Sequence, residues 1–433
     1  MMNKMINRAV VQDGPIISFV HHGQILWVQV PKYNREIFRI EGGNMKKLEI
    51  YIHIPFCVKK CDYCDFLSAP ADTQTVERYV KALKNEIEIN SEKMKGYLVD
   101  TIFIGGGTPS ILEESQIADI MKALSENAKI SDEAEITIEC NPGTVTREKL
   151  LCYKKAGINR ISLGLQSADD EELKAIGRIH SYEQFLESFN LARKSGFDNI
   201  NVDLMSALPR QTQKSYKETL KKVISLNPEH ISAYSLIVEE GTRMEKRVRE
   251  AKAQGEEILP TEDEERKMYY LTKEFLENAG YQRYEISNYS KRGKECRHNV
   301  GYWKRVEYLG FGIGAASLYK DERYKNSSDI NKYMDIFKEK KASDEIYQSV
   351  REENTCLNEQ DKMEEFMFLG LRMMEGIDTR DFNEQFKVSY DSIYEERTKK
   401  LLGQNLLKQE GTQISLTEKG MDLSNYVMSE FMF

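Results

Sequence analysis

Short runs of β-branched and apolar residues alternate along this chain with longer segments in which apolar residues recur at helical spacing. From Leu48 onward six such runs predict strands, over residues 48–55, 100–105, 135–140, 160–166, 199–204 and 230–237. Between the first two runs, one helix face is formed by Val76, Tyr79, Val80, Leu83 and Ile87. Strands that alternate with helices in this way predict an α/β fold, with right-handed βα units around a parallel sheet.

The number of strands predicts the shape of that sheet. A closed barrel of βα units needs eight strands, so six predict a partial (β/α)₆ barrel that is open on one side. Glu139, Gln166 and Asp203 each stand near the carboxyl end of a predicted strand, where side chains of such folds converge on a ligand. Each one alone is equally compatible with a helix cap or a buried polar group. Together they predict a site at this edge of the sheet.

The chain divides into three predicted parts. Residues 1–44 are an N-terminal extension of unknown role, in which the β-prone runs 16–20, 25–30 and 36–40 predict a small hairpin. Residues 45–325 hold the predicted barrel. Residues 326–433 begin with a weakly patterned connector and continue as a C-terminal domain, with helical segments near 359–375, 379–386 and 390–404.

Charge and composition exclude some partners. The 433 residues carry 62 basic and 70 acidic side chains, a net charge of −8, so no basic field attracts nucleic acid or anionic lipid. No window approaches the roughly 18 consecutive apolar residues of a membrane span, and no signal core follows the N-terminus. The seven cysteines form no regular disulfide framework. We therefore expect a cytoplasmic protein that does not bind nucleic acid.

Three cysteines lie within eight residues, directly after the first predicted strand: Cys57, Cys61 and Cys64. Three thiolates can hold one cubic iron–sulfur cluster and leave the fourth iron open to an exchangeable ligand. A structural zinc site is the alternative, but such sites are closed by four ligands and usually contain two separated cysteine pairs. The residues between the cysteines, including Lys59, Lys60 and Asp62, are expected to be solvated.

A glycine run closes the second predicted strand, in the segment Gly105-Gly106-Gly107-Thr108-Pro109. Glycines leave room for backbone groups to approach a ligand, and the proline then fixes the exit of the chain. By itself such a run is usually a tight turn. Next to the cysteine loop it predicts a second wall of the same site.

These motifs resemble the radical SAM superfamily, and the segment from about residue 47 to 430 resembles its HemN/HemW branch. The resemblance implies a partial (β/α)₆ TIM-type barrel followed by a mostly helical, winged-helix-like C-terminal domain. It also implies a [4Fe-4S] cluster on Cys57, Cys61 and Cys64 that binds S-adenosyl-L-methionine (SAM). The positions that match SAM-contacting residues of the superfamily are Tyr51, Gly106, Gly107, Thr108, Glu139, Gln166, Arg178 and Asp203.

Two functions compete within this branch. The coproporphyrinogen dehydrogenases carry a fourth cysteine two positions after the third, where this chain has Phe66, and an N-terminal segment that residues 1–44 lack. Residues 298–303, His-Asn-Val-Gly-Tyr-Trp, instead match the HNxxYW motif of the heme chaperones. The resemblance therefore implies a heme chaperone without catalytic residues. The alternatives are an oxygen-independent coproporphyrinogen III dehydrogenase, or a radical SAM enzyme acting on another large planar substrate.

The heme ligand and the partners follow from the same motif. His298 is the expected ligand, because histidine is a usual axial ligand of heme iron. Cys296 is an alternative as a thiolate, and a purely structural role of His298 remains open. We expect structural roles for His53, His180 and His230. The resemblance further implies heme transfer to acceptor hemoproteins, including membrane-bound respiratory enzymes, and a homodimer.

Overall fold

The computed structural model describes residues 16–21, 24–29, 45–340 and 349–433. It divides into two compact units, Met1–Met45 and Lys46–Phe433. In the first unit β1 (Ile16–His21) and β2 (Gln24–Gln29) pair as an antiparallel hairpin, which confirms the two first β-prone runs. The third run, 36–40, lies outside the described residues.

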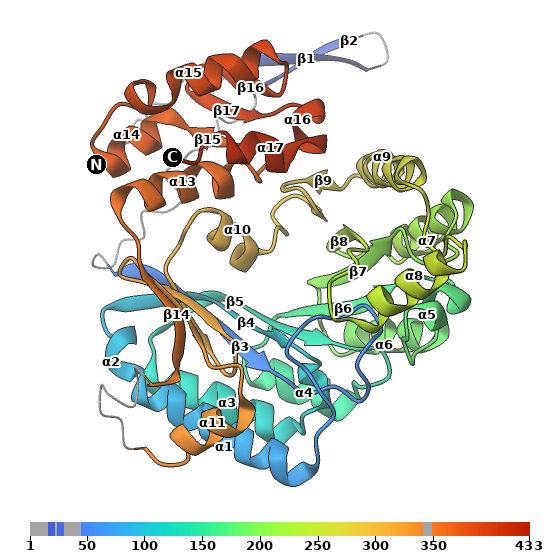
Figure 1. Cartoon of the computed structure of the whole chain (residues 1–433), viewed down its shortest axis with the longest axis vertical. Coiled ribbons are helices and arrows are strands. Elements are labelled where there is room, and N and C mark those ends of the chain that lie inside the picture. The colour runs from blue at the N-terminus through green and yellow to red at the C-terminus, as the bar shows by residue number, and fades with distance from the viewer. Residues whose placement is uncertain (1–15, 22–23, 30–44, 341–348) are drawn as a thin grey trace, which may run out of the picture. The chain divides into compact units, whose positions relative to one another are not determined.

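All six predicted strands form the centre of one large sheet in the second unit (Figure 1). They are parallel neighbours in chain order: β3 (Lys46–Ile54), β4 (Tyr97–Gly106), β5 (Ile130–Cys140), β6 (Arg160–Gln166), β7 (Ile200–Ser206) and β8 (His230–Ser235). A seventh parallel strand, β11 (Tyr308–Phe311), pairs with β3.

Short antiparallel strands extend both edges of this sheet. Beyond β11 they are β12 (Ala316–Tyr319), β13 (Glu322–Asn326) and β14 (Arg351–Cys356), and beyond β8 they are β10 (Asn288–Ser290) and β9 (Gln282–Arg283). The order therefore ends in two edges, at β14 and β9, and the sheet does not close on itself. The open partial barrel is confirmed.

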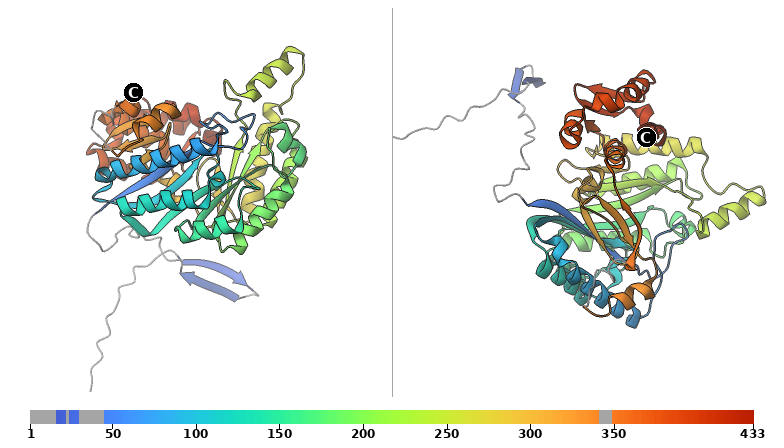
Figure 2. Two further views of the ribbon diagram at one scale, coloured as in Figure 1. Left: turned by 90° about the horizontal axis from the view of Figure 1, so that it is seen from below. Right: turned by 60° about the vertical axis from the view of Figure 1, so that its left-hand side comes forward.

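Helices cover the outer face of the sheet (Figures 1 and 2). Two helices lie apart from this layer: α8 (Arg243–Ala253), which is bonded to the loop after β3, and α10 (Arg297–Trp303), which contacts β4 from the interior side. The helices of the outer face are α1 (Thr73–Ile89), α2 (Ser91–Met94), α3 (Glu114–Asn127), α4 (Arg147–Lys155), α5 (Asp170–Ala175), α6 (Tyr182–Lys194), α7 (Gln213–Ser225), α9 (Glu262–Asn278) and α11 (Ile330–Ile336), with a 3₁₀ turn at Pro109–Ile111. The predicted helix face packs here, since Tyr79, Leu83 and Ile87 of α1 are fully buried.

Alternation along each strand separates this apolar outer core from a polar barrel interior. In β3, Leu48, Ile50, Ile52 and Ile54 are fully buried members of the main hydrophobic core, so the residues between them face the interior. The register continues this interior across the sheet, because Glu49 pairs with Thr101 and Thr101 with Glu135. We call the carboxyl ends of β3–β8, with loop 57–68, the rim, and this amino-terminal layer of Glu49, Thr101 and Glu135 the floor.

The C-terminal elements have their own hydrophobic core. The helices are α13 (Glu359–Gly370), α14 (Thr379–Phe386), α15 (Tyr390–Gly403), α16 (Glu418–Asp422) and α17 (Ser424–Ser429), around a small sheet of β15 (Ile377–Asp378), β17 (Gln413–Leu416) and β16 (Leu407–Glu410). The predicted helices are confirmed. The predicted connector instead contains α11 and β14, so the large sheet continues past residue 325. The domain limits 45–325 and 326–433 stay a prediction.

No helix in the described part of the chain is both long enough and apolar enough to cross a membrane.

Candidate functional site

The cysteine loop, residues 57–68, leaves the rim between β3 and α1. Its base is closed because Cys57 N donates to Ala69 O at 3.2 Å and Ala69 N donates to Pro55 O at 3.0 Å. All three cysteines are free thiols of intermediate exposure, and burial raises the pKa of Cys64.

The arrangement of these thiols bears on the zinc alternative. Within the described ranges, no three His, Cys, Asp or Glu side chains converge on one point that suits a metal ion. A zinc ion needs its ligands around one point, whereas a cubic cluster takes each thiolate on a separate iron.

One cavity at the rim brings ten of the predicted residues together. It is lined by Cys57, Cys61, Cys64, Gly106, Gly107, Thr108, Glu139, Gln166, Arg178 and Asp203. Tyr51 does not line it; its hydroxyl lies 3.0 Å from His53 Nδ1 and its ring stacks on Phe103 at 6.4 Å. Residues far apart in the chain thus form one site, because their strands end at the same edge of the sheet.

The glycine run lies so close to the end of β3 and the residues after it that larger side chains would not fit there. A Cβ on Gly107 would lie 2.6 Å from Phe56 O, and Gly107 N donates to Ile54 O at 2.8 Å. Gly106 has a φ of 109°, which favours glycine. The run therefore brings Thr108 beside the cysteine loop, with its Oγ1 3.4 Å from Cys57 Sγ.

Arg178 connects the cysteine loop to the strands. Its Nη1 lies 3.6 Å from Cys61 Sγ and its Nη2 donates to Asn141 Oδ1 at 2.9 Å. Buried Arg178 Nε and Gln166 Oε1 have no hydrogen-bond partner among the described residues. Since buried polar atoms are nearly always paired, these two atoms fit a bound ligand that supplies an acceptor and a donor. The donor set therefore suits SAM, which carries a carboxylate, an ammonium group and ribose hydroxyls.

Two carboxyl groups complete the rim. Glu139 Oε2 accepts a hydrogen bond from Gly106 N at 3.0 Å, and burial, together with the charge of Asp203, raises the pKa of Glu139 to about 8. Burial also raises the pKa of Asp203, although Asn201 Nδ2 at 2.7 Å and Ser162 Oγ at 3.1 Å donate to it. A ligand cation at Glu139 would favour its ionised form.

The sequence reasoning missed Asn141 and misplaced Asp62. Asn141 follows β5 in an Asn-Pro-Gly turn, and its Nδ2 donates to Thr108 Oγ1 at 2.9 Å, so a polar residue directly after a strand was the available signal. The expectation that Asp62 is solvated is wrong. Its carboxylate is bonded to Arg247 of α8 at 2.9 Å and its side chain is 18% exposed. No local sequence pattern predicts an ion pair between Asp62 and a residue as far along the chain as Arg247.

His298 lies at the floor, not at the rim. It is 1% exposed on α10, with Nδ1 2.7 Å from Thr101 Oγ1 and its ring stacked on Phe103 at 5.3 Å. Its backbone N donates to Glu135 Oε1 at 3.3 Å. Nε2 is buried and has no partner among the described residues. Burial, together with the charge of Arg160, lowers the pKa of His298 to about 3, so the imidazole is neutral.

Cys296, the alternative heme ligand, is also buried at the floor, where its Sγ donates to Glu135 Oε1 at 3.6 Å. Burial raises its pKa to about 12. This residue is therefore a thiol at neutral pH, which disfavours a thiolate ligand.

His230 has the structural role expected of it, since Nδ1 lies 2.6 Å from Asn201 Oδ1 and Nε2 2.8 Å from the Tyr284 hydroxyl. His53 is likewise bonded through both ring nitrogens, to Tyr51 and to Leu67 O.

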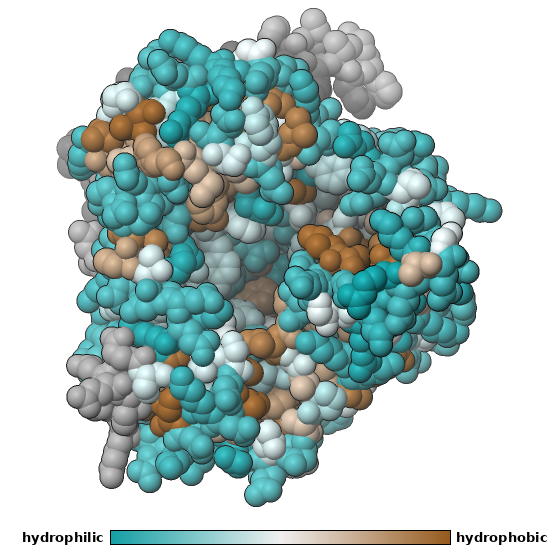
Figure 3. Space-filling model, viewed as in Figure 1, coloured by the Kyte–Doolittle hydropathy of each residue, from teal (hydrophilic) through white to brown (hydrophobic). Residues whose placement is uncertain are grey.

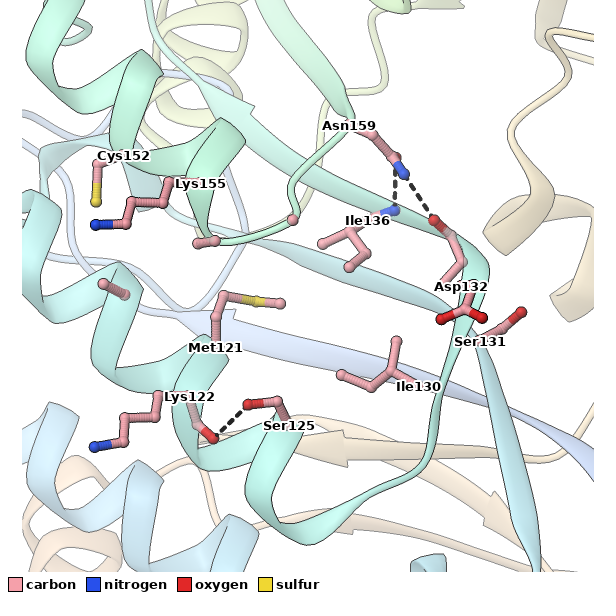
Figure 4. Close-up of a pocket in the computed structure, with 14 residues that line it drawn as sticks. Met121, Lys122, Ser125, Ile130, Ser131, Asp132, Ile136, Cys152, Lys155 and Asn159 are labelled. Carbon is pink, nitrogen blue, oxygen red and sulfur yellow. Dashed lines mark hydrogen bonds between the residues drawn. The ribbon is translucent and has the colours of Figure 1, made fainter.

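A second pocket lies on the helix-covered side, between α3, α4 and the start of β5 (Figure 4). Its walls are mainly apolar, with Met121, Ile130 and Ile136, and Asn159 uses its side chain to bond the backbone of β5. None of the predicted site residues lines it. We assign no chemistry to this pocket.

Comparisons with known proteins agree with this site. Residues 51–223 match the family model of the radical SAM superfamily, and residues 357–423 match that of the HemN C-terminal domain. The chain is 36% identical to the heme chaperone HemW of Lactococcus lactis and 37% identical to that of Bacillus subtilis. These matches cover 88% of this chain and 96% and 98% of the two relatives.

A solved structure is similar over nearly the same length. Coproporphyrinogen III oxidase (HemN) from Escherichia coli, described as a radical SAM enzyme, has a TM-score of 0.75 and 25% identity, covering 89% of this chain and 90% of that one. A radical SAM fold implies SAM and a [4Fe-4S] cluster, and the donor set at the rim fits both. The chain belongs to the HemW family of the radical SAM superfamily.

Proposed function

We propose that this protein is a heme chaperone, which binds heme and a SAM-ligated [4Fe-4S] cluster and transfers heme to acceptor hemoproteins. The observation that carries the proposal is the identity of 36–37% over nearly the full length of two relatives named heme chaperones. The proposal includes membrane-bound respiratory enzymes as acceptors and a homodimer, which rest on the sequence resemblance alone.

The surface of the rim supports binding of an apolar molecule. The four most exposed large hydrophobic side chains of the described residues all belong to loops there: Val58, Phe66, Ile179 and Ile237. The face displayed in Figure 3 is mostly hydrophilic, with hydrophobic side chains in a few patches. Apolar patches on a soluble protein mark binding sites. Phe66 also occupies the position where the dehydrogenases carry a further thiol, which favours the chaperone over the oxidative enzyme.

The cluster and SAM divide the rim between them in this proposal. The three cysteines hold the cluster, and the family pattern assigns SAM to Gly106, Gly107, Thr108, Glu139, Gln166, Arg178 and Asp203, with Tyr51 below them. A cluster held by these cysteines and reduced by an external one-electron donor would supply one electron to SAM. Arg178 can pair the SAM carboxylate, and Glu139 can accept hydrogen bonds from its ammonium group.

His298 remains the proposed heme ligand. Its free Nε2 supports this role, because a neutral imidazole with one nitrogen bonded and the other unpaired is the form that ligates iron. Since His298 lies on the buried side of α10, against Thr101 and Phe103 of β4, heme reaches it only if α10 moves away from that strand. Trp303 of the same helix is held by Arg372, which stacks on its ring at 4.4 Å from the centroid.

The proposal is tested by dividing one anaerobically reconstituted preparation between two assays. In a heme titration, His298→Gln should lower the affinity at least tenfold, about 1.4 kcal/mol. His230→Gln is the matched control, because it removes an equally buried histidine whose two ring nitrogens are both bonded. The second assay supplies coproporphyrinogen III, SAM and a reductant. Porphyrin formed at enzyme-like rates would contradict the chaperone function, and equal heme affinity in both variants would exclude His298.

A further inference from the structure

The tip of the cysteine loop is bonded to two elements far along the chain. Asp62 stands between Cys61 and Cys64, and its Oδ2 accepts a hydrogen bond from Arg247 Nη1 of α8 at 2.9 Å. Its backbone N donates to Ile176 O at 3.1 Å, and its carbonyl accepts from Met244 N at 2.8 Å. Its Oδ1 lies 3.8 Å from Arg243 Nη1, also of α8, so the carboxylate pairs with two arginines of one helix and the backbone is bonded to α8 and to the turn after α5.

The same contacts reach the residues of the rim. Arg247 Nη1 also donates to Ala175 O, at the end of α5, at 2.6 Å, so one guanidinium joins α8, the cysteine loop and the residue before the turn. That turn passes through Gly177, where a Cβ would lie 2.8 Å from Asp62 Oδ1, and continues into Arg178. Arg178 in turn lies against Cys61 Sγ. The ion pair and the thiol are thus connected through a short, tightly packed segment.

The tip of the cysteine loop also makes apolar contacts. Tyr63 packs against a separate hydrophobic cluster of Ile176, Met205, Leu208, Leu236 and Met244. This packing is not directional, whereas an ion pair supported by backbone hydrogen bonds fixes orientation. The apolar contacts of Tyr63 therefore hold the loop in place, whereas the ion pair of Asp62 sets the orientation of the loop.

We propose that the Asp62–Arg247 ion pair is a positioning clamp, which sets the orientation of Cys61 and Cys64 before a cluster is inserted. The inference rests on the proposed assignment of the cluster to these cysteines. Asp62 itself contacts no thiol in the described contacts and acts through the loop backbone. The clamp reduces the number of conformations that the cysteine loop adopts before a cluster binds. It also slows the opening of the loop once the cluster is bound.

The first test uses the cluster-free protein and measures amide hydrogen exchange of residues 57–68. Asp62→Asn and Arg247→Gln should each speed exchange in this loop roughly tenfold, the equivalent of about 1.4 kcal/mol. The double variant should exchange more slowly than the two single effects added together predict, because both substitutions remove the shared pair, while Arg247 also bonds Ala175 O and Asp62 also pairs with Arg243. Arg247→Lys, which restores the charge, should recover part of the protection. Arg249→Gln is the matched control on the same helix, since the side chain of Arg249 is 69% exposed and pairs with Glu245 one turn away on that helix.

The second test measures iron loss to a chelator from the reconstituted proteins. The two clamp variants should lose iron several-fold faster than wild type and the control, with an unchanged melting temperature. Exchange and iron loss equal to those of Arg249→Gln would overturn the clamp. A melting temperature lowered in step with faster iron loss would overturn it too, because the pair would then stabilise the whole fold. If wild type takes up no cluster, the cluster assignment fails, while the exchange data still decide whether the pair orders the loop.

Discussion

The rim and the floor of this barrel both contain buried polar atoms without hydrogen-bond partners, but the two regions differ in how a ligand can reach those atoms. At the rim, Arg178 Nε and Gln166 Oε1 are unpaired beside a cavity, and neighbouring glycines leave room for a ligand. At the floor, Glu49 Oε2 and His298 Nε2 are unpaired as well, but α10 contacts β4, and His298 is held by two hydrogen bonds and by the stacking of its ring on Phe103. The rim is built to receive a ligand in its present conformation, whereas the floor has to open first.

This difference assigns the two regions different parts of the proposed function. In the proposed function the rim is the site of the cluster and SAM, and ten predicted residues line one cavity there. Heme binding at His298 requires displacement of α10, which also contacts α13 of the C-terminal elements. Through this contact, a movement of the C-terminal elements would shift α10 and with it the heme site at His298. Such a link suits a chaperone, which must release the heme that it binds.

The largest expected effect is the loss of the cluster on substitution of a cysteine at the rim. Cys61→Ser should abolish the cluster almost completely, because it removes one of three thiolates that hold it. The measurement is iron and sulfide per chain after anaerobic reconstitution, with the visible spectrum. Cys152→Ser is the control, since Cys152 is a free cysteine on α4 outside the rim cavity. Unchanged iron content in Cys61→Ser, or zinc in place of iron, would contradict the assignment.

The rim was more predictable from sequence than the floor for a physical reason. Glu139 and Gln166 lie at the carboxyl ends of β5 and β6, and Asp203 lies within the neighbouring β7, so the strand pattern alone places them close together. His298 meets Thr101 across nearly two hundred positions, and its motif indicates a family without indicating a location. The short edge strands were missed as well, since β9 and β10 have two and three residues and carry no periodic signal.

The two regions should also respond to pH in opposite directions. Glu139 has a folded pKa of about 8 against an ordinary 4.5, so the folded state holds a proton that the unfolded chain has lost. Its contribution therefore makes the protein less stable as pH rises from 4.5 to 8. His298 has a folded pKa of about 3 against 6.5, so the unfolded chain binds the extra proton. Its contribution makes the protein less stable as pH falls from 6.5 to 3.

Denaturant unfolding of the cofactor-free protein measures both contributions. Each group changes the free energy of unfolding by at most about 1.4 kcal/mol per pH unit within its window. Glu139→Gln should flatten the pH dependence above 4.5, and His298→Gln should flatten it below 6.5. Variants that leave the slopes of wild type unchanged would show that these two groups are not the buried titrating ones.

The smallest effect is expected at Phe66, where the rim differs from that of the dehydrogenases. Phe66 is 60% exposed, so Phe66→Cys should change the free energy of unfolding by no more than about 0.5 kcal/mol. It restores the further thiol of the dehydrogenases but not their N-terminal segment, and His298 and the floor stay as they are. We therefore expect no coproporphyrinogen turnover and an unchanged heme affinity, measured in the two anaerobic assays above, with Leu67→Cys as the neighbouring control. Turnover gained by Phe66→Cys alone would show that one side chain at the rim separates the two activities, and that the floor has no part in the choice.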